Sequence, residues 1–136
     1  MTKPKLIVVD DDPGMAKLVK AAGESSGFDV LITTSAREFQ KTWAENTSSV
    51  IVMDIVIPEM DGVELLMWLA EQNCSAPIIL ISGYGGKYLE MTKTLATDKK
   101  VKIVGTLTKP FKIDDLEKML KEALPSSDRK GLAAPL

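Results

Sequence analysis

The sequence predicts an α/β domain in which helices cover both faces of a five-stranded parallel sheet. Two observations carry this prediction. Short apolar runs alternate with helical patterns along the whole chain, and the connections between them are short. The runs are apolar on both faces, which is typical of a parallel sheet buried on both sides. Right-handed crossovers then give a doubly wound sheet, for which we expect the strand order 2-1-3-4-5.

The first strand is the apolar run at residues 6–9, which leads into a row of aspartates. Asp12 is a favourable helix N-cap, and a proline follows it at the first position of a helix predicted over residues 13–25. Gly27 suits the C-terminal end of that helix. The second strand then covers residues 28–33.

Ser35, with Glu38 three residues later, forms the pattern of a capping box and opens a helix that reaches about residue 46. Residues 50–53 form the third strand, and residues 62–73 form the helix that follows it. The apolar residues at helical spacing in this helix are Val63, Leu66, Met67 and Ala70.

The fourth strand covers residues 77–81, and a glycine-rich loop at residues 83–86 follows it. A weaker helical pattern extends over residues 87–97, and the fifth strand covers residues 101–107. A Lys-Pro-Phe sequence then leads into a last helix over residues 113–124, which a proline ends.

The chain's 136 residues fit one domain, which we expect to span residues 1–124. Residues 125–136 are small and polar without periodicity, which predicts a flexible tail or the stub of a linker. With 17 basic and 19 acidic side chains, the formal net charge of −2 gives no reason to bind nucleic acid or an anionic membrane.

The location expected from the sequence is the cytoplasm. The single cysteine, Cys74, excludes an internal disulfide and suits a reducing compartment. The first apolar run is too short for a signal peptide, and no segment has the length needed to span a bilayer. The chain has no histidine, so any chemistry that requires an imidazole must find it on another molecule.

Polar side chains stand at the carboxyl ends of the predicted strands, which is where open parallel sheets bind their ligands. Each has an ordinary interpretation by itself as a turn former, a cap or a surface charge, and for Asp12 we prefer the cap. The functional prediction depends on four of the five strand ends carrying polar groups of complementary charge. These residues are Asp10 and Asp11 after the first strand, Asp54 after the third, Ser82 after the fourth and Lys109 after the fifth.

Converging carboxylates repel each other unless one is protonated or a cation lies between them. Two unit charges about 4 Å apart cost roughly 4 kcal/mol at an effective dielectric near 20. Oxygen ligands favour a hard cation such as Mg²⁺, which often completes its shell with phosphate oxygens. Lys109 offers a positive charge to the same phosphate and Ser82 a hydrogen bond. Asp54, central among these groups, is the best candidate for a nucleophile that accepts a phosphoryl group.

At these residues the chain resembles the receiver domains of two-component response regulators of the chemotaxis-regulator type, which have a flavodoxin-like topology. The resemblance covers about residues 4–124 and depends on four motifs in the correct order: VVDDD, MDIVIPEMDG, LISG and KPF. It also implies a cis peptide bond between Lys109 and Pro110.

The resemblance implies that Asp54 accepts a phosphoryl group from a histidine of a partner histidine kinase or histidine phosphotransfer protein. The chain would then be a phospho-acceptor that takes part in its own phosphorylation and self-dephosphorylation, and not an enzyme with a separate substrate. The absence of histidine agrees with a donor on another protein. The implied Mg²⁺ ligands, direct or through water, are Asp10, Asp11, Asp54 and the backbone carbonyl of Val56, and the implied phosphoryl-binding residues are Ser82 and Lys109.

One residue departs from the family pattern. Receiver domains usually carry Tyr or Phe on the fifth strand where this chain has Thr106, which cannot swing inward as the aromatic ring does. The usual output switch is therefore in question, whereas the phosphorylation chemistry is not. Tyr84 and Tyr88 are nearby aromatics that either replace it or are surface contacts. Val56 and Tyr84 should flank the phosphoryl group and give attacking water little help, which predicts slow self-dephosphorylation.

Other functions share some of these features. Haloacid-dehalogenase-like phosphatases also use an aspartate nucleophile and Mg²⁺, and the DDD sequence fits their D-x-D motif. The chain is short for that fold, however, and Asp114 and Asp115 fall in the first turn of a helix. An FMN-binding flavodoxin would need a phosphate loop after the first strand, which this sequence lacks. A receiver-like binding module that works without phosphorylation stays open because of Thr106.

No DNA-binding motif is present, so the output requires a downstream protein target or an output domain that this chain does not include. Receiver domains often dimerise, and the sequence leaves the oligomeric state open. The cognate kinase and its signal are not encoded in any pattern that we recognise.

Overall fold

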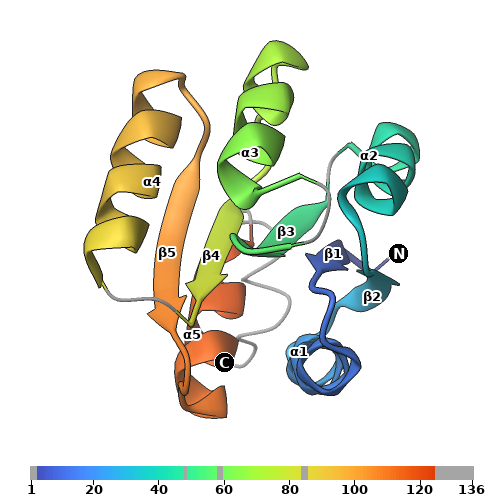
Figure 1. The fold of residues 1–136 in the computed structure, drawn as a ribbon. Helices are drawn as coiled ribbons and strands as arrows, with labels where there is room; N and C mark the ends of the chain where they lie inside the picture. Colours follow the sequence, from blue (N-terminus) through green and yellow to red (C-terminus); the bar gives the residue numbers. More distant parts are fainter. Residues whose placement is uncertain (1–2, 48, 58–59, 84–85, 125–136) are drawn as a thin grey trace.

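The structure is a computed structural model that describes residues 3–47, 49–57, 60–83 and 86–124. The predicted tail at residues 125–136 lies outside the described residues, and so does Tyr84 of the predicted glycine-rich loop. Figure 1 shows strands and helices alternating along the chain, as the sequence predicts. The strands are β1 (Lys5–Val9), β2 (Asp29–Thr33), β3 (Val50–Asp54), β4 (Ile78–Ser82) and β5 (Ile103–Thr108). The helices are α1 (Pro13–Ser25), α2 (Ala36–Glu45), α3 (Gly62–Glu71), α4 (Gly86–Asp98) and α5 (Ile113–Ala123).

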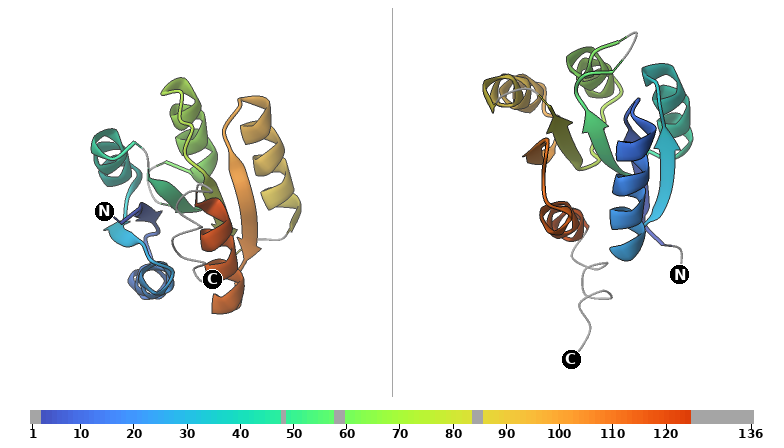
Figure 2. Two further views of the ribbon diagram at one scale, coloured as in Figure 1. Left: turned by 180° about the vertical axis from the view of Figure 1, so that it is seen from behind. Right: turned by 60° about the horizontal axis from the view of Figure 1, so that its bottom comes forward.

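The five strands are parallel and lie in the order β2-β1-β3-β4-β5, which confirms the predicted doubly wound topology. Helices α1 and α5 cover one face of the sheet, and α2, α3 and α4 cover the other (Figure 2, right). Two hydrophobic clusters fill the spaces between the sheet and these two helix layers. The strands β1, β3 and β4 are buried almost throughout, whereas the edge strands β2 and β5 are partly exposed.

The predicted helix signals act largely as expected. The Asp12 side chain accepts a hydrogen bond from the Gly14 N–H and caps α1. Gly27 has a φ of 92°, which suits a glycine just beyond the end of that helix. The capping box is modified, because Ser35 Oγ accepts from the Glu38 N–H while the Glu38 carboxylate accepts from Thr34, one residue earlier than the usual arrangement.

The structure corrects two details of the sequence prediction. The fifth strand begins at Ile103 and not at Val101, because the Val101 N–H donates to the Ala96 carbonyl and completes the end of α4. In α3 the fully buried residues are Gly62, Leu65, Leu66 and Leu69, so only Leu66 is shared with the apolar residues noted at helical spacing in the sequence. Val63, Met67 and Ala70 are half-buried.

Candidate functional site

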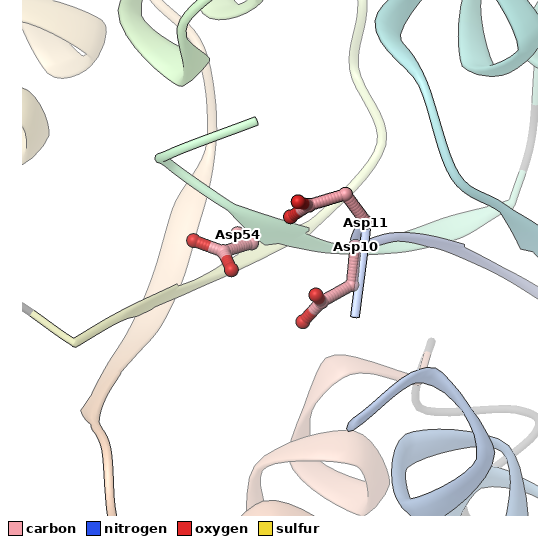
Figure 3. A group of neighbouring side chains, drawn as sticks. All are labelled: Asp10, Asp11 and Asp54. Atoms are coloured by element: carbon pink, nitrogen blue, oxygen red, sulfur yellow. The ribbon is translucent and has the colours of Figure 1, made fainter. Parts of the chain in front are cut away.

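Three carboxylates meet at the carboxyl ends of β1 and β3 (Figure 3). Oxygen atoms of Asp10, Asp11 and Asp54 lie within 4.8 Å of one another. Their proximity follows from the topology, because β1 and β3 are neighbours in register, with Val9 opposite Met53, so the next residue of each strand falls beside the other. Asp10 and Asp54 are buried, whereas Asp11 is exposed.

Lys109 enters this acidic cluster from the end of β5. Its Nζ atom lies 2.8 Å from Asp54 Oδ2 and 3.7 Å from Asp10 Oδ2. The Lys109 backbone N–H donates to the Ser82 carbonyl over 2.8 Å, which fixes the lysine to the end of β4. The following peptide bond, to Pro110, is cis, as the family resemblance implied.

Opposing effects act on the pKa of Lys109. Burial lowers the pKa, but the hydrogen bond to Asp54 and the charges of Asp10 and Asp54 together raise it above its usual value. The ammonium is therefore held in its charged form beside the carboxylates. A phosphoryl group bound at the same place would meet a fixed positive charge.

Asp10 has a raised pKa, and burial is the largest cause. The hydrogen bond from the Asp12 N–H to Asp10 Oδ1, at 2.9 Å, lowers the pKa, whereas the nearby Asp54 charge raises it again. The single ammonium of Lys109 thus leaves the cluster with an excess of negative charge. A second cation among these oxygens would relieve that excess.

Asp54 is held at both of its oxygens. Oδ1 accepts the Val56 N–H at 3.0 Å, and Oδ2 accepts from Lys109 at 2.8 Å. Val56 therefore lies beside the carboxylate, as expected from the sequence, and this residue is 40 % exposed. The site opens to solvent next to Asp54.

Ser82 is the last residue of β4 and is fully buried. Its position follows from register: Asp54 pairs with Ile81 across β3 and β4, and Ser82 pairs with Thr108 across β4 and β5. Ser82 therefore lies between the strand ends that carry Asp54 and Lys109. The structure thus places Asp10, Asp11, Asp54, Val56, Ser82 and Lys109 at or next to neighbouring strand ends.

Sequence reasoning missed Thr33, which positions Asp10. The Thr33 side chain is buried and donates from Oγ1 to the Val8 carbonyl at 2.6 Å. Its own carbonyl accepts the Asp10 N–H at 3.1 Å. The hydroxyl residue at the carboxyl end of the second strand was the available signal, whereas the carbonyl that contacts Asp10 has none in the sequence.

Thr106, the residue that departs from the family pattern, is half-buried in β5 opposite Leu80. Leu80 belongs to the cluster beneath α2, α3 and α4, so Thr106 is on the side of the sheet that α4 covers. Tyr88 of α4 packs against that same cluster and is also half-buried. Tyr88 is thus more than a surface contact, whereas Tyr84 lies outside the described residues.

The acidic cluster fits a hard divalent cation. All its donor atoms are carboxylate oxygens, the ligands that Mg²⁺ prefers, and they already converge. The chain has no histidine, and its single cysteine, Cys74, is buried in the hydrophobic cluster after α3, away from these strand ends. In the described part of the chain, no helix combines the length and apolar character needed to cross a membrane.

Comparisons with known proteins agree with this geometry. The family model described as "Response regulator receiver domain" matches residues 6–121. The chain is 29 % identical over 127 residues to the transcriptional regulatory protein FixJ of Bradyrhizobium diazoefficiens, covering 93 % of this chain and 60 % of FixJ. It is 31 % identical over 120 residues to the response regulator receiver protein CpdR of Brucella abortus, covering 85 % of this chain and 96 % of CpdR.

Solved structures show the same similarity. A response regulator from Colwellia psychrerythraea has a TM-score of 0.78 and 32 % identity, with 89 % of this chain and 96 % of that chain covered. The chemotaxis response regulator CheY4 of Vibrio cholerae has a TM-score of 0.75 and 25 % identity. The match covers 90 % of this chain and 100 % of the CheY4 chain. The chain spans 60 % of FixJ and 51 % of PhoP of Bacillus subtilis, so these relatives contain additional sequence.

Proposed function

The chain belongs to the response regulator receiver domain family of two-component systems, and on that premise we propose that Asp54 is its phospho-acceptor. The donor is a phosphohistidine of a partner histidine kinase or histidine phosphotransfer protein. An Asp54 carboxylate oxygen attacks phosphorus, the P–N bond to the donor imidazole breaks, and that imidazole leaves with the bonding electron pair. The observation that carries the proposal is Asp54 itself, a buried carboxylate held beside both an ammonium and two further acids.

Asp10, Asp11 and Asp54, with the backbone carbonyl of Val56, are the groups that we expect to hold Mg²⁺, directly or through water. The convergent oxygens and the raised pKa of Asp10 support this set. When bound, Mg²⁺ would neutralise charge on the phosphoryl oxygens and on the acids around them.

Lys109 and Ser82 complete the phosphoryl site. Lys109 leaves its ion pair with Asp54 when an oxygen of that carboxylate is phosphorylated to form an acyl phosphate, and then pairs with a phosphoryl oxygen. Ser82, at the end of the neighbouring strand, donates its hydroxyl hydrogen to another of these oxygens. The resulting movement at the ends of β4 and β5 is the source of the signal.

The signal passes to a downstream protein or to an output domain outside this chain. CpdR, which aligns over 96 % of its own length, shows that a relative can consist of little more than this domain. We place the protein in the cytoplasm, where a partner kinase domain would meet it, and expect no direct role for nucleic acid or membrane binding. The weak net charge of −2 supports that expectation.

The alternative functions have less support. A haloacid-dehalogenase-like phosphatase is disfavoured because Asp114 and Asp115 lie in the first turn of α5, where they complement the helix dipole. A module that works without phosphorylation would keep converging buried carboxylates for no chemical use, which is a cost to stability.

The proposal is tested by intact mass after incubation with acetyl phosphate or phosphoramidate, with Mg²⁺ or with EDTA. We expect one phosphoryl group on the native chain with Mg²⁺, and none with EDTA or on Asp54→Asn. The matched control is Asp61→Asn, because Asp61 lies in the same β3–α3 connection and only caps α3, a task that asparagine also performs. Phosphorylation of folded Asp54→Asn, or none of the native chain, would overturn the proposal.

A further inference from the structure

The peptide unit between Ile55 and Val56, which directly follows Asp54, is held at both of its ends. The Ile55 carbonyl accepts a hydrogen bond from the Gly62 N–H at 2.7 Å. The Val56 N–H donates to Asp54 Oδ1 at 3.0 Å. In a planar trans peptide the carbonyl and the N–H point in opposite directions. A group that fixes the Ile55 carbonyl therefore also fixes the direction in which the Val56 N–H points.

Gly62 can hold this carbonyl because of its place in α3. It is the first residue of the helix, and the first N–H groups of a helix have no acceptor within the helix itself. Gly62 and Ile55 are both buried, so water does not compete for the hydrogen bond between them. The start of α3 thus supplies a donor to the peptide that contacts Asp54.

This contact requires a residue without a side chain. A Cβ atom at Gly62 would lie 2.4 Å from Ile55 Cα and 2.8 Å from the Ile55 carbonyl oxygen, the same oxygen that accepts the Gly62 N–H. No side-chain rotation relieves a clash with backbone atoms. Ile55 is also tied to β4, because its own N–H donates to the Ile81 carbonyl at 3.0 Å. The contact that has to lengthen is therefore the hydrogen bond from Gly62.

We propose that Gly62 is a positioning residue for the phosphorylation of Asp54, and this inference rests on the proposed function. Asp54 Oδ1 accepts the Val56 N–H and Oδ2 accepts from Lys109, so the carboxylate is fixed from two sides. If the Ile55–Val56 peptide turns, Lys109 alone holds the carboxylate, which can then rotate about its side-chain bonds. Poor alignment of an attacking group slows a reaction even when every reacting group is present.

Hydrogen exchange of the Val56 amide, followed by NMR in EDTA, tests the positioning without any phosphorylation. Val56 is 40 % exposed, so the protection of its N–H depends on the hydrogen bond to Asp54. In Gly62→Ala this amide should exchange roughly ten-fold faster than in wild type, or more, because the peptide is no longer held.

The matched control is Gly23→Ala. A Cβ atom at Gly23 would also be crowded, at 2.7 and 2.8 Å from side-chain atoms of β1 and β2, but these contacts lie on the face of the sheet that α1 covers. This variant should lose stability by overpacking and leave the exchange of the Val56 amide unchanged.

The rate of phosphorylation at saturating phosphoramidate and Mg²⁺, measured by intact mass, is the second readout. Gly62→Ala should react roughly ten-fold more slowly than wild type, or more, whereas Gly23→Ala should keep the wild-type rate. Val56→Pro removes the N–H itself at an exposed position and should be slowed in the same way. Circular dichroism establishes that each variant is folded, and Val56→Pro decides the question if Gly62→Ala does not fold.

Wild-type exchange and a wild-type rate in folded Gly62→Ala would overturn the proposal, and so would a wild-type rate in folded Val56→Pro. An equal loss in Gly23→Ala would also overturn it, because general destabilisation would then explain the effect. A native chain that takes up no phosphoryl group would instead overturn the proposed function. The exchange of the Val56 amide, which needs no phosphoryl donor, separates that outcome from a failure of the role of Gly62.

Discussion

The ammonium of Lys109 lies 2.8 Å from the carboxylate of Asp54 and joins the ends of β5 and β3 across the end of β4. The two residues are 55 positions apart in sequence, yet each is placed by its own strand end. This ion pair occupies the position where a phosphoryl group on Asp54 would need its counter-charge. Under the proposed function, phosphorylation of Asp54 would disrupt this ion pair as the first step of the signal.

Lys109→Met should destabilise the metal-free protein, because the carboxylates of Asp10 and Asp54 then lose the ammonium that pairs with them. We expect a decrease of about 1 to 3 kcal/mol in the free energy of unfolding, measured by urea denaturation in EDTA. Millimolar Mg²⁺ should reduce the difference in unfolding free energy between wild type and Lys109→Met, since the metal supplies positive charge to the same oxygens. Lys109→Arg, which keeps the charge, is the control. Equal stability of wild type and Lys109→Met in EDTA would show that this lysine does not compensate the acids.

Asp10→Asn should stabilise the metal-free protein at pH 7, by on the order of 1 kcal/mol, because it removes a buried charge and keeps an oxygen that can accept from Asp12. The pKa of Asp10 is raised above 3.8 in the folded state, chiefly by burial. The folded protein therefore holds the proton more tightly than the unfolded chain, and the stability contributed by this proton is lost as pH rises through the folded pKa.

The extra stability of Asp10→Asn relative to wild type should therefore be largest above the folded-state pKa of Asp10. It should decrease as the pH falls towards 3.8. Thermal melts in EDTA across this range measure it. The same substitution should abolish the increase in Tm that Mg²⁺ gives the wild type. A stability difference between Asp10→Asn and wild type that does not depend on pH would contradict this interpretation. So would a variant that is less stable than wild type at pH 7 in EDTA.

Gly62→Ala should cost more than about 2 kcal/mol of stability. A Cβ atom at Gly62 would lie 2.4 Å from Ile55 Cα and 2.8 Å from the Ile55 carbonyl oxygen, and these backbone atoms cannot move aside easily. Gly14→Ala is the matched control near the start of α1, where the nearest atom is 3.4 Å away. It should be neutral or slightly stabilising, because alanine favours helix. Chemical denaturation measures the unfolding free energy of both variants. Similar losses of stability in Gly62→Ala and Gly14→Ala would contradict the close approach of α3 to Ile55.

Self-dephosphorylation should be slow, with a half-life much longer than seconds. Val56 adjoins Asp54 and is 40 % exposed, so water reaches the site past an apolar side chain that cannot orient it. Val56→Glu should shorten the half-life by roughly ten-fold or more, because a carboxylate can position a water for attack. Val56→Leu is the control. Loss of phosphoryl from phosphorylated protein after donor removal, followed by intact mass, gives both rates.

Much of this site could be predicted because parallel sheets place their functional groups at the carboxyl ends of strands. Asp10, Asp54, Ser82 and Lys109 each follow a recognisable apolar run, so finding the strands was enough to find the residues. Their mutual distances follow from the register of adjacent strands, and register is set by the same apolar pattern.

Three features of the structure depend on three-dimensional contacts that the sequence pattern does not show. Thr33 positions Asp10 through its backbone carbonyl, and a carbonyl leaves no signature in the sequence. The helical spacing in α3 did not identify its buried side, because this helix is apolar nearly all round, which gives its periodicity little contrast. The beginning of β5 was placed too early because Val101 is equally suitable for a strand and for the end of α4.

The most direct test of Asp54 as phospho-acceptor is to locate the phosphoryl group by reductive trapping. Borohydride reduces an aspartyl phosphate to homoserine, which peptide mass spectrometry then assigns to a position. After incubation of the full chain with acetyl phosphate and Mg²⁺, we expect homoserine at position 54 alone, and none when EDTA replaces Mg²⁺. Homoserine at position 10 or 11 instead, or none at all in folded protein that has been exposed to the donor, would contradict the assignment of Asp54.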